Sequence, residues 1–144
     1  AQLARCVDEL AVVEPTFVSV TYGAGGTTRD DTRDLVVEID QQRAFPAMPH
    51  LTCIGHTRDE LTELIGDYRA AGIDNVLALA GDPPVDGSEA VGDFTYASEL
   101  VGLVRSIGDM SIAVAAFPEG HPRSARLPDD RRRERDVRRG GVLL

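Results

Sequence analysis

The sequence holds few of the residues that build disulfide frameworks and metal sites. Its 144 residues include two cysteines and three histidines. Two cysteines are too few for a disulfide framework and are typical of reduced thiols in a cytoplasmic protein, which is the location we expect. Only Cys53 and His56 lie close together in the sequence, whereas a structural metal site usually has four ligands. We therefore predict that the protein has no metal centre.

Long apolar stretches are also missing. No run of 18 apolar residues is available to span a membrane, and no basic segment followed by an apolar stretch opens the chain as a secretory signal would. The chain starts at Ala1 rather than at a methionine, which suggests that upstream residues are missing. A chain of this length with 42% hydrophobic residues can bury the core of one domain.

Positive charge is scarce until the last part of the chain. Residues 1–122 contain 7 Arg against 20 Asp and Glu, a net charge of −13, whereas residues 123–144 contain 8 Arg against 4, a net charge of +4. The acidic body argues against a nucleic-acid-binding surface there. We expect neither a nucleic acid nor a membrane as a partner.

Apolar runs alternate with amphipathic segments along residues 1–122. Runs rich in β-forming or apolar residues occupy positions 17–21, 49–54, 75–80 and 111–117, and each is preceded by a segment with helical spacing of apolar residues. Thr28 with Asp31 and Thr57 with Glu60 have the spacing of capping boxes. Gly72 and Gly108 are the expected ends of two helices.

This alternation predicts an α/β fold with about four parallel strands and intervening helices. A partial (β/α)8 barrel and an open doubly wound sheet both fit such a pattern. Residues 23–28 offer the first two glycines of a dinucleotide fingerprint but have Thr28 where the third should stand, which disfavours the second fold. Polar residues also recur at the strand ends, where a β/α barrel places its chemistry. We therefore predict a partial β/α-barrel domain over residues 1–122.

Five segments, taken together in order and spacing, resemble the methylenetetrahydrofolate reductase family from about Leu3 to Pro122. They are residues 17–24 (FVSVTYGA), 49–53 (PHLTC), 79–84 (LAGDPP), 96–100 (YASEL) and 115–122 (AAFPEGHP).

The resemblance implies an oxidoreductase of one-carbon metabolism and methionine biosynthesis that carries FAD at the C-terminal mouth of the barrel. NADH or NADPH would reduce the flavin, which would in turn reduce 5,10-methylenetetrahydrofolate to 5-methyltetrahydrofolate. The resemblance also implies a set of cofactor contacts: Thr21, Tyr22, Gly23, Ala24, His50, Gly81, Asp82, Ala97, Phe117 and His121.

Asp82 is the residue to which the resemblance assigns a catalytic role, because its charge would tune the flavin and stabilise a cationic iminium form of the substrate. Without the resemblance, Asp82 fits ordinary turn chemistry, and His50 fits a histidine with satisfied hydrogen bonds in the core. The sequence departs from the family pattern at Ala80, where some members have a basic residue, and at Phe117, which is often Tyr. The family's general acid, a Glu in an earlier strand, would lie before Ala1.

Residues 123–144 form an Arg-rich tail in which the resemblance stops. Its many arginines without lysine suggest a frameshifted gene, so we expect a non-native or disordered segment. A basic arm for a polyanion is the alternative, although the tail lacks aromatic residues that stack on bases. A solvated helix over 129–139 also fits the mixed charges.

A half-barrel exposes two parallel sheet edges and its inner face. We therefore expect the chain alone to be marginally stable, to lack activity, and to gain from forming a homo-oligomer in which two halves complete a barrel. Two alternative functions stay open. The first is a non-catalytic half-barrel remnant or binding module with a basic tail. The second is a different flavin-dependent barrel enzyme related to proline dehydrogenases.

Overall fold

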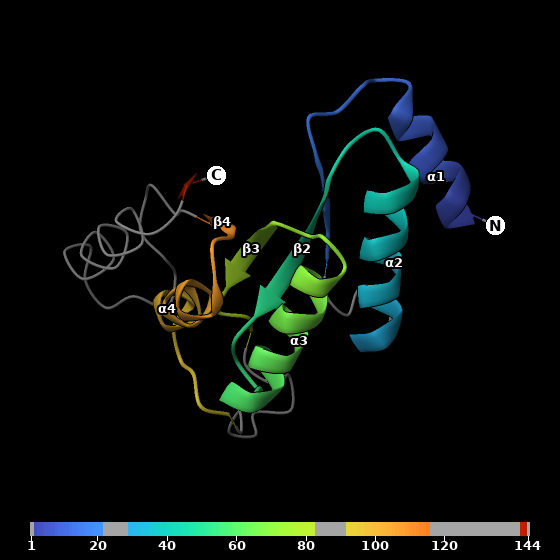
Figure 1. Cartoon of the computed structure of the whole chain (residues 1–144). Coiled ribbons are helices and arrows are strands. Elements are labelled where there is room, and N and C mark those ends of the chain that lie inside the picture. The colour runs from blue at the N-terminus through green and yellow to red at the C-terminus, as the bar shows by residue number, and fades with distance from the viewer. Residues whose placement is uncertain (1, 22–28, 83–91, 116–141, 144) are drawn as a thin grey trace.

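The protein alternates helices and strands, as a computed structural model shows for residues 2–21, 29–82, 92–115 and 142–143 (Figure 1). The elements, in chain order, are α1 (Gln2–Ala11), β1 (Val18–Val20), α2 (Arg29–Gln42), β2 (Ala47–Thr52), α3 (Arg58–Ala70), β3 (Asn75–Leu79), α4 (Ala97–Ile107), β4 (Ser111–Val114) and β5 (Val142–Leu143).

The strands form one parallel sheet in the order β1-β2-β3-β4-β5. Within β2 the pairing passes from one neighbour to the other, because Ala47 to Pro49 pair with β1 and His50 to Thr52 pair with β3. Such a stagger between neighbouring strands is what a barrel requires of its sheet. The partial β/α-barrel architecture predicted from the sequence is therefore confirmed.

Local sequence explains where α3 begins and ends. Thr57 accepts a hydrogen bond from the backbone N–H of Glu60, and the Glu60 carboxylate accepts one from the backbone N–H of Thr57, which confirms the predicted capping box. At the other end Gly72 has φ +93° and donates to the Arg69 carbonyl, while Ile73 donates to the Tyr68 carbonyl. These two bonds satisfy carbonyl groups that the helix would otherwise leave free.

The second predicted helix stop is also confirmed, because α4 ends at Ile107 directly before Gly108. Arg69 of α3 donates a hydrogen bond of 2.8 Å to the Ile107 carbonyl, so the end of α4 is capped by a side chain from a neighbouring helix. The other predicted capping residue, Thr28, lies outside the described residues. Its partner Asp31 lies in the first turn of α2 together with Asp30.

The core lies between the sheet and its helices. Leu51 of β2, Val76 of β3 and Ile65 of α3 are fully buried, and α4 adds Leu100 and Val104. Figure 1 shows α3 in front of β2 and β3, so these side chains fill the space between helix and sheet. Side chains alternate along a strand, so the residues between the core positions face the other side of the sheet.

Two details of the sheet differ from the sequence prediction. β2 starts at Ala47 rather than at Pro49, because Ala47 pairs with Val18 and its N–H donates to the Asp40 carboxylate, 2.9 Å away. The proline stands where the pairing passes from β1 to β3. The pairing of Val142 and Leu143 with β4 was not predicted from the sequence at all.

Candidate functional site

The carboxyl ends of parallel strands meet at one edge of a sheet, which is where β/α barrels carry their sites. Thr21 directly follows β1 and is exposed, and Gly81 and Asp82 come two and three residues after β3. His50 lies in the second half of β2, and Ala97 is the first residue of α4. The fold therefore brings Thr21, Gly81 and Asp82 to this edge.

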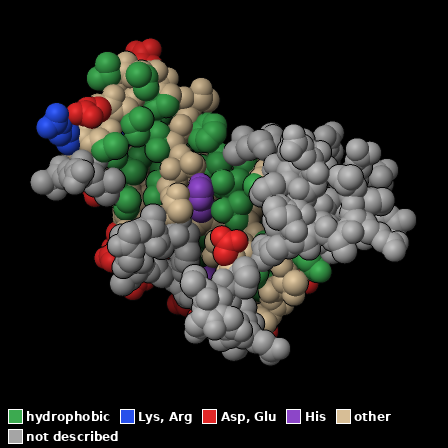
Figure 2. Space-filling model, turned by 180° about the vertical axis from the view of Figure 1, so that it is seen from behind, with side chains coloured by type: hydrophobic (Ala, Val, Ile, Leu, Met, Phe, Trp, Pro, Cys, Tyr) green, Lys and Arg blue, Asp and Glu red, His purple; other side chains and the backbone are tan. Residues whose placement is uncertain are grey.

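His50 points away from the helical core. Its neighbours Pro49 and Leu51 are buried on the core side, whereas His50 is half-buried on the opposite face. Figure 2, which views the molecule from behind, shows hydrophobic side chains gathered on that side of the molecule. Its register partner is Leu77. Val20 pairs with Pro49, so Thr21, which follows β1, and His50 each come one residue after this pair.

The imidazole of His50 carries a buried nitrogen, Nε2. Within the described residues, His50 Nε2 has no hydrogen-bond partner. Burial lowers the pKa of His50 below its usual 6.5, so the ring is neutral at pH 7. A neutral imidazole offers one donor and one acceptor, so this nitrogen is available for a polar atom of a ligand.

Gly81 packs directly against the end of β2. Its φ is +88°, and a Cβ at this position would lie 3.2 Å from Thr52 Cβ and 3.5 Å from Ile54 Cβ. The backbone angle favours glycine, and the contact with Thr52 leaves little room for a side chain. Gly81 lies four residues beyond Leu77, about 13 Å along the strand direction from the level of His50. The predicted residues therefore line an elongated stretch of the face, which suits an extended ligand.

Cys53 lies behind this stretch, on the core side. Its thiol is fully buried and donates a hydrogen bond to the Ala80 carbonyl, with 3.4 Å between sulfur and oxygen. Burial raises the pKa of the thiol to about 11, and the negative charge of Glu99 adds to the effect. A thiol in this state is not a nucleophile near neutral pH.

Because Cys53 keeps its proton in the folded state up to about pH 11 but loses it near pH 9 when unfolded, alkaline pH favours unfolding. The stabilisation is fully present below pH 9 and is lost as the pH rises towards 11, by up to about 2–3 kcal/mol. Urea unfolding between pH 8 and pH 11 measures it. We expect Cys53→Ala to flatten this pH dependence and Cys6→Ala, at an exposed thiol, to leave it unchanged. Equal slopes for the wild type and Cys53→Ala would contradict the assignment.

Ala97 is half-buried at the start of α4, next to the carboxylate of Glu99, which caps the helix start. The backbone N–H groups of Thr95 and Tyr96 both donate to Glu99 Oε2, each at 2.8 Å. The position of Ala97 is thus fixed by its own helix. Five further residues of the predicted site lie outside the described residues: Tyr22, Gly23, Ala24, Phe117 and His121.

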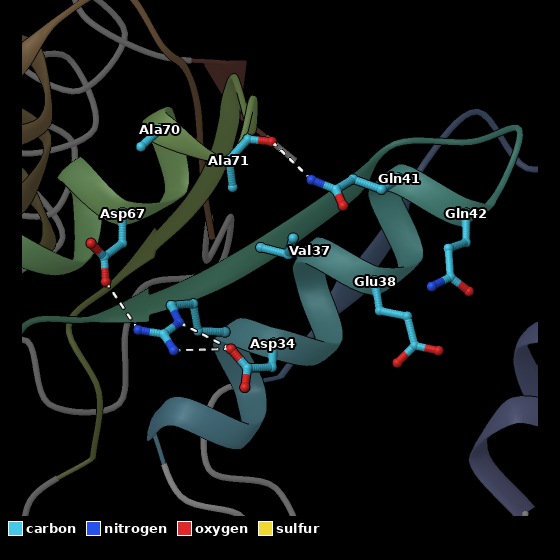
Figure 3. A pocket seen from close by; sticks show the side chains of 9 residues that line it. Asp34, Val37, Glu38, Gln41, Gln42, Asp67, Ala70 and Ala71 are labelled. Atoms are coloured by element: carbon cyan, nitrogen blue, oxygen red, sulfur yellow. Dashed lines mark hydrogen bonds and ion pairs between the residues drawn. The ribbon is translucent and has the colours of Figure 1, made fainter.

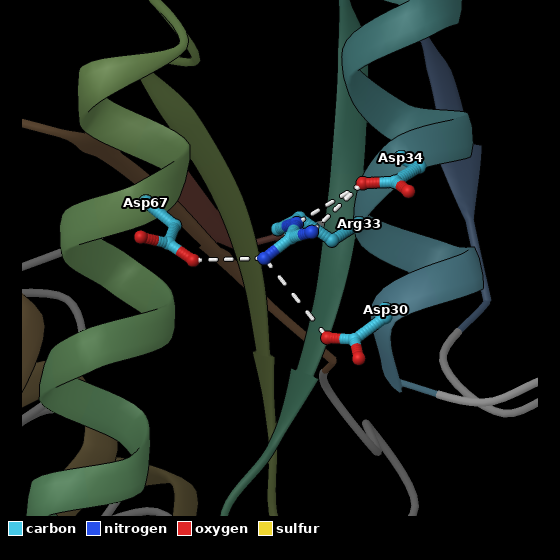
Figure 4. Close-up of polar contacts among 4 residues, drawn as sticks. All are labelled: Asp30, Arg33, Asp34 and Asp67. Atoms are coloured by element: carbon cyan, nitrogen blue, oxygen red, sulfur yellow. Dashed lines mark hydrogen bonds and ion pairs between the residues drawn. The ribbon is translucent and has the colours of Figure 1, made fainter.

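A groove of about 580 Å³ lies elsewhere, between α2 and α3 on the outer surface of the helices (Figure 3). Sequence analysis did not identify it. Arg33 of α2 crosses it and donates to Asp34, at 3.0 Å, and to Asp67 of α3, at 3.1 Å (Figure 4). These hydrogen bonds raise the pKa of Arg33. Because its charge is balanced by carboxylates and no predicted site residue lines the groove, it has no part in the candidate site.

The described residues contain no cluster of three or more metal-binding side chains, and none of their helices is long and apolar enough to cross a membrane.

Sequence analysis missed the contact between Asp93 and the start of α3, because the two lie 35 residues apart. No motif spacing signals such a contact.

Comparison with known proteins identifies the family of this chain. The family described as Methylenetetrahydrofolate reductase matches residues 1–140. The chain belongs to the methylenetetrahydrofolate reductase family. The match runs past Pro122, beyond the five motifs, and the domain boundary expected after residue 122 stays a prediction.

The curated relatives bear the family's name, so the family is one of oxidoreductase enzymes. The 5,10-methylenetetrahydrofolate reductases of Salmonella typhimurium and Pectobacterium carotovorum are 45% and 43% identical to the chain and cover 81% of it. The Arabidopsis thaliana protein named methylenetetrahydrofolate reductase (NADH) 1 is 39% identical over 121 residues. The chain spans 38% of the length of the two bacterial relatives and 20% of the Arabidopsis protein.

Solved structures support the barrel fold of this methylenetetrahydrofolate reductase family chain. A phosphonomutase from Burkholderia cenocepacia superposes with a TM-score of 0.64 at 18% identity, over 95% of this chain and 63% of that one. A dihydrodipicolinate synthase from Agrobacterium tumefaciens gives 0.52, also at 18% identity, over 78% of this chain and 37% of that one. At this identity the likeness shows the fold alone.

Proposed function

We propose that the chain forms part of the flavin site of an NAD(P)H-dependent methylenetetrahydrofolate reductase. Membership of the family supports the folate substrate and the oxidoreductase chemistry. When bound, FAD supplies hydride transfer from NADH or NADPH to 5,10-methylenetetrahydrofolate, giving 5-methyltetrahydrofolate. The chain's own residues contribute binding, placement and electrostatics.

The observation that carries this proposal is the buried His50 Nε2 without a hydrogen-bond partner within the described residues. Leaving a buried polar atom unpaired costs about 1–3 kcal/mol, so a ligand that pairs with it recovers free energy on binding. His50 lies on the sheet face opposite the helical core, where a cofactor across the barrel mouth would lie. A polar atom of a flavin at this place would satisfy the nitrogen.

Gly81 and Asp82 complete the part of the site that the described residues contain. The missing side chain at Gly81 lets its backbone pack directly against Thr52 and Ile54. Asp82 follows directly and is exposed. Its carboxylate can hold a cationic iminium form of the folate by charge attraction and can bias the electronic state of a neighbouring flavin.

The other residues implied by the family are proposed as further cofactor contacts. Thr21 lies at the same edge of the sheet as Asp82, and Ala97 offers close approach at the first turn of α4. Tyr22, Gly23, Ala24, Phe117 and His121 are carried by the resemblance alone. We expect no turnover from the chain by itself, because it spans only 38% of its bacterial relatives.

Binding of FAD to the chain tests this proposal, because the proposed cofactor contacts lie within the chain. We expect FAD fluorescence to be quenched saturably on titration with the chain, and His50→Ala and Asp82→Ala each to weaken binding at least tenfold. Asp109→Ala is the matched control, because Asp109 is also an exposed aspartate but lies before β4, at the other end of the strands. It should bind FAD as the wild type does.

An equal loss of affinity in Asp109→Ala, or no saturable binding by the wild type, would contradict the proposal. The second outcome would favour the alternative of a non-catalytic binding module with a basic tail. The alternative of a proline-dehydrogenase-like barrel is tested in a longer protein that turns over. There, reoxidation of the reduced flavin by a folate, and not by an imine of proline, would exclude that alternative.

A further inference from the structure

The segments that lead into α3 and α4 are joined by two hydrogen bonds. The backbone N–H of Asp93 donates to the carbonyl of His56, 3.0 Å away. The carboxylate of Asp93 accepts from the backbone N–H of Arg58, with 2.8 Å between Asp93 Oδ2 and the nitrogen. Asp93 therefore contacts both sides of Thr57, the residue that caps α3.

Side-chain packing reinforces this junction. The guanidinium of Arg58 lies over the ring of Phe94, 5.1 Å from its centre, and Phe94 itself is buried. Gly92 passes so close to His56 that a Cβ there would lie 2.7 Å from the His56 carbonyl oxygen and 2.8 Å from its nitrogen. A glycine at position 92 is thus a condition for the contact.

The same stretch of chain also supports the beginning of the β3–α4 connection. Gly81 rests on Thr52 and Ile54, and Gly92 rests on Gly55 and His56. Both described ends of the connection therefore lie on residues 52–58. Asp82 is the first residue after the Gly81 contact.

The capping box of α3 forms without Asp93, which adds a bond to the backbone N–H of Arg58. Thr57 and Glu60 already satisfy each other's backbone N–H groups at the start of α3. The distinctive consequence of the Asp93 bonds is that they attach the segment before α4 to the segment before α3. The two strand-end segments around the candidate site are then held as one unit.

We propose that Asp93 is a positioning residue for the flavin site, holding the segment before α4 on residues 56–58, next to the residues on which Gly81 rests, so that Asp82 stays in place. This inference rests on the proposed function, because it assigns Asp93 a role in presenting the flavin-binding residues. Asp93 acts through Asp82 and Gly81 and need not touch a ligand itself.

Three variants of the chain test it. Asp93→Ala removes the carboxylate, and Asp93→Asn keeps a side-chain oxygen that can accept from Arg58. Thr57→Ala weakens the same helix start by removing a hydroxyl that bonds Glu60 and not Asp93. We expect Asp93→Ala to weaken FAD binding at least fivefold and to speed hydrogen exchange of the Gly81 and Asp82 amides. Asp93→Asn should restore most of the affinity. Thr57→Ala should lower stability comparably yet leave both measurements within twofold of the wild type.

Equal effects of Asp93→Ala and Thr57→Ala on both measurements would overturn the inference, because Asp93 would then only stabilise α3. A wild-type chain without saturable FAD binding would contradict the proposed function instead. The exchange rates at Gly81 and Asp82 would still decide whether Asp93 holds this segment, and unchanged rates in Asp93→Ala would show that it does not.

Discussion

Replacing Leu51 with alanine is expected to lower the free energy of unfolding by about 2–5 kcal/mol. Leu51 is fully buried in β2, within the core between the sheet and its helices. The substitution removes apolar surface from the core and leaves a cavity that the tightly packed neighbours fill only in part. Domains of this kind are stable by about 5–15 kcal/mol in total, so the loss is large.

Urea unfolding followed by far-ultraviolet circular dichroism measures this loss. Two variants serve as controls. Leu51→Met keeps the volume of the side chain and should cost less than about 1.5 kcal/mol. Val12→Ala alters a side chain that is 82% exposed and should change the stability by less than about 0.5 kcal/mol. If Leu51→Ala unfolded at the same urea concentration as Val12→Ala, the core described above would be wrong.

Replacing Gly81 with valine is expected to lower the affinity for FAD at least tenfold. A β-branched residue is a genuine outlier at a φ of +88°, so the backbone must rearrange. The Cβ would also press on Thr52 at 3.2 Å, which forces residues 80–82 away from β2. Asp82 would be displaced with them. The strain itself should cost about 1–3 kcal/mol of stability.

Gly72→Val is the matched control for this experiment. Gly72 has a similar φ of +93°, but a Cβ there would meet no atom within 4 Å, and it lies at the other end of the strands. We expect both variants to lose stability and only Gly81→Val to lose the quenching of FAD fluorescence. Normal flavin affinity in Gly81→Val would show that the backbone at Gly81 takes no part in binding.

Much of the fold could be predicted from local sequence. The spacing of Leu61, Leu64, Ile65 and Tyr68 predicted a helix with one buried face, and all four side chains are buried in α3. Thr57 with Glu60 marked its start and Gly72 its end, because caps depend on residues within a few positions of each other. The four apolar runs predicted β1 to β4, because a buried strand is also recognised from a few neighbouring residues. β2 starts two residues earlier than expected.

The candidate site could be predicted in part. His50, Gly81 and Asp82 were identified through the family motifs and not from their chemistry alone. His50 is otherwise an ordinary strand residue. Only the placed neighbours on its face show that its Nε2 has no hydrogen-bond partner within the described residues. Asp93 was missed, because its two hydrogen bonds join it to residues 35 and 37 positions earlier in the chain.

The sequence by itself determined both boundaries of α3, the end of α4, the parallel α/β alternation and the family. These depend on short-range spacing and on motifs that are read residue by residue. Only the tertiary structure decided which side of the sheet His50 faces, how Asp93 joins the starts of α3 and α4, and why burial raises the pKa of Cys53 to about 11. Burial and long-range hydrogen bonds are properties of residues brought together by folding, so no local pattern encodes them.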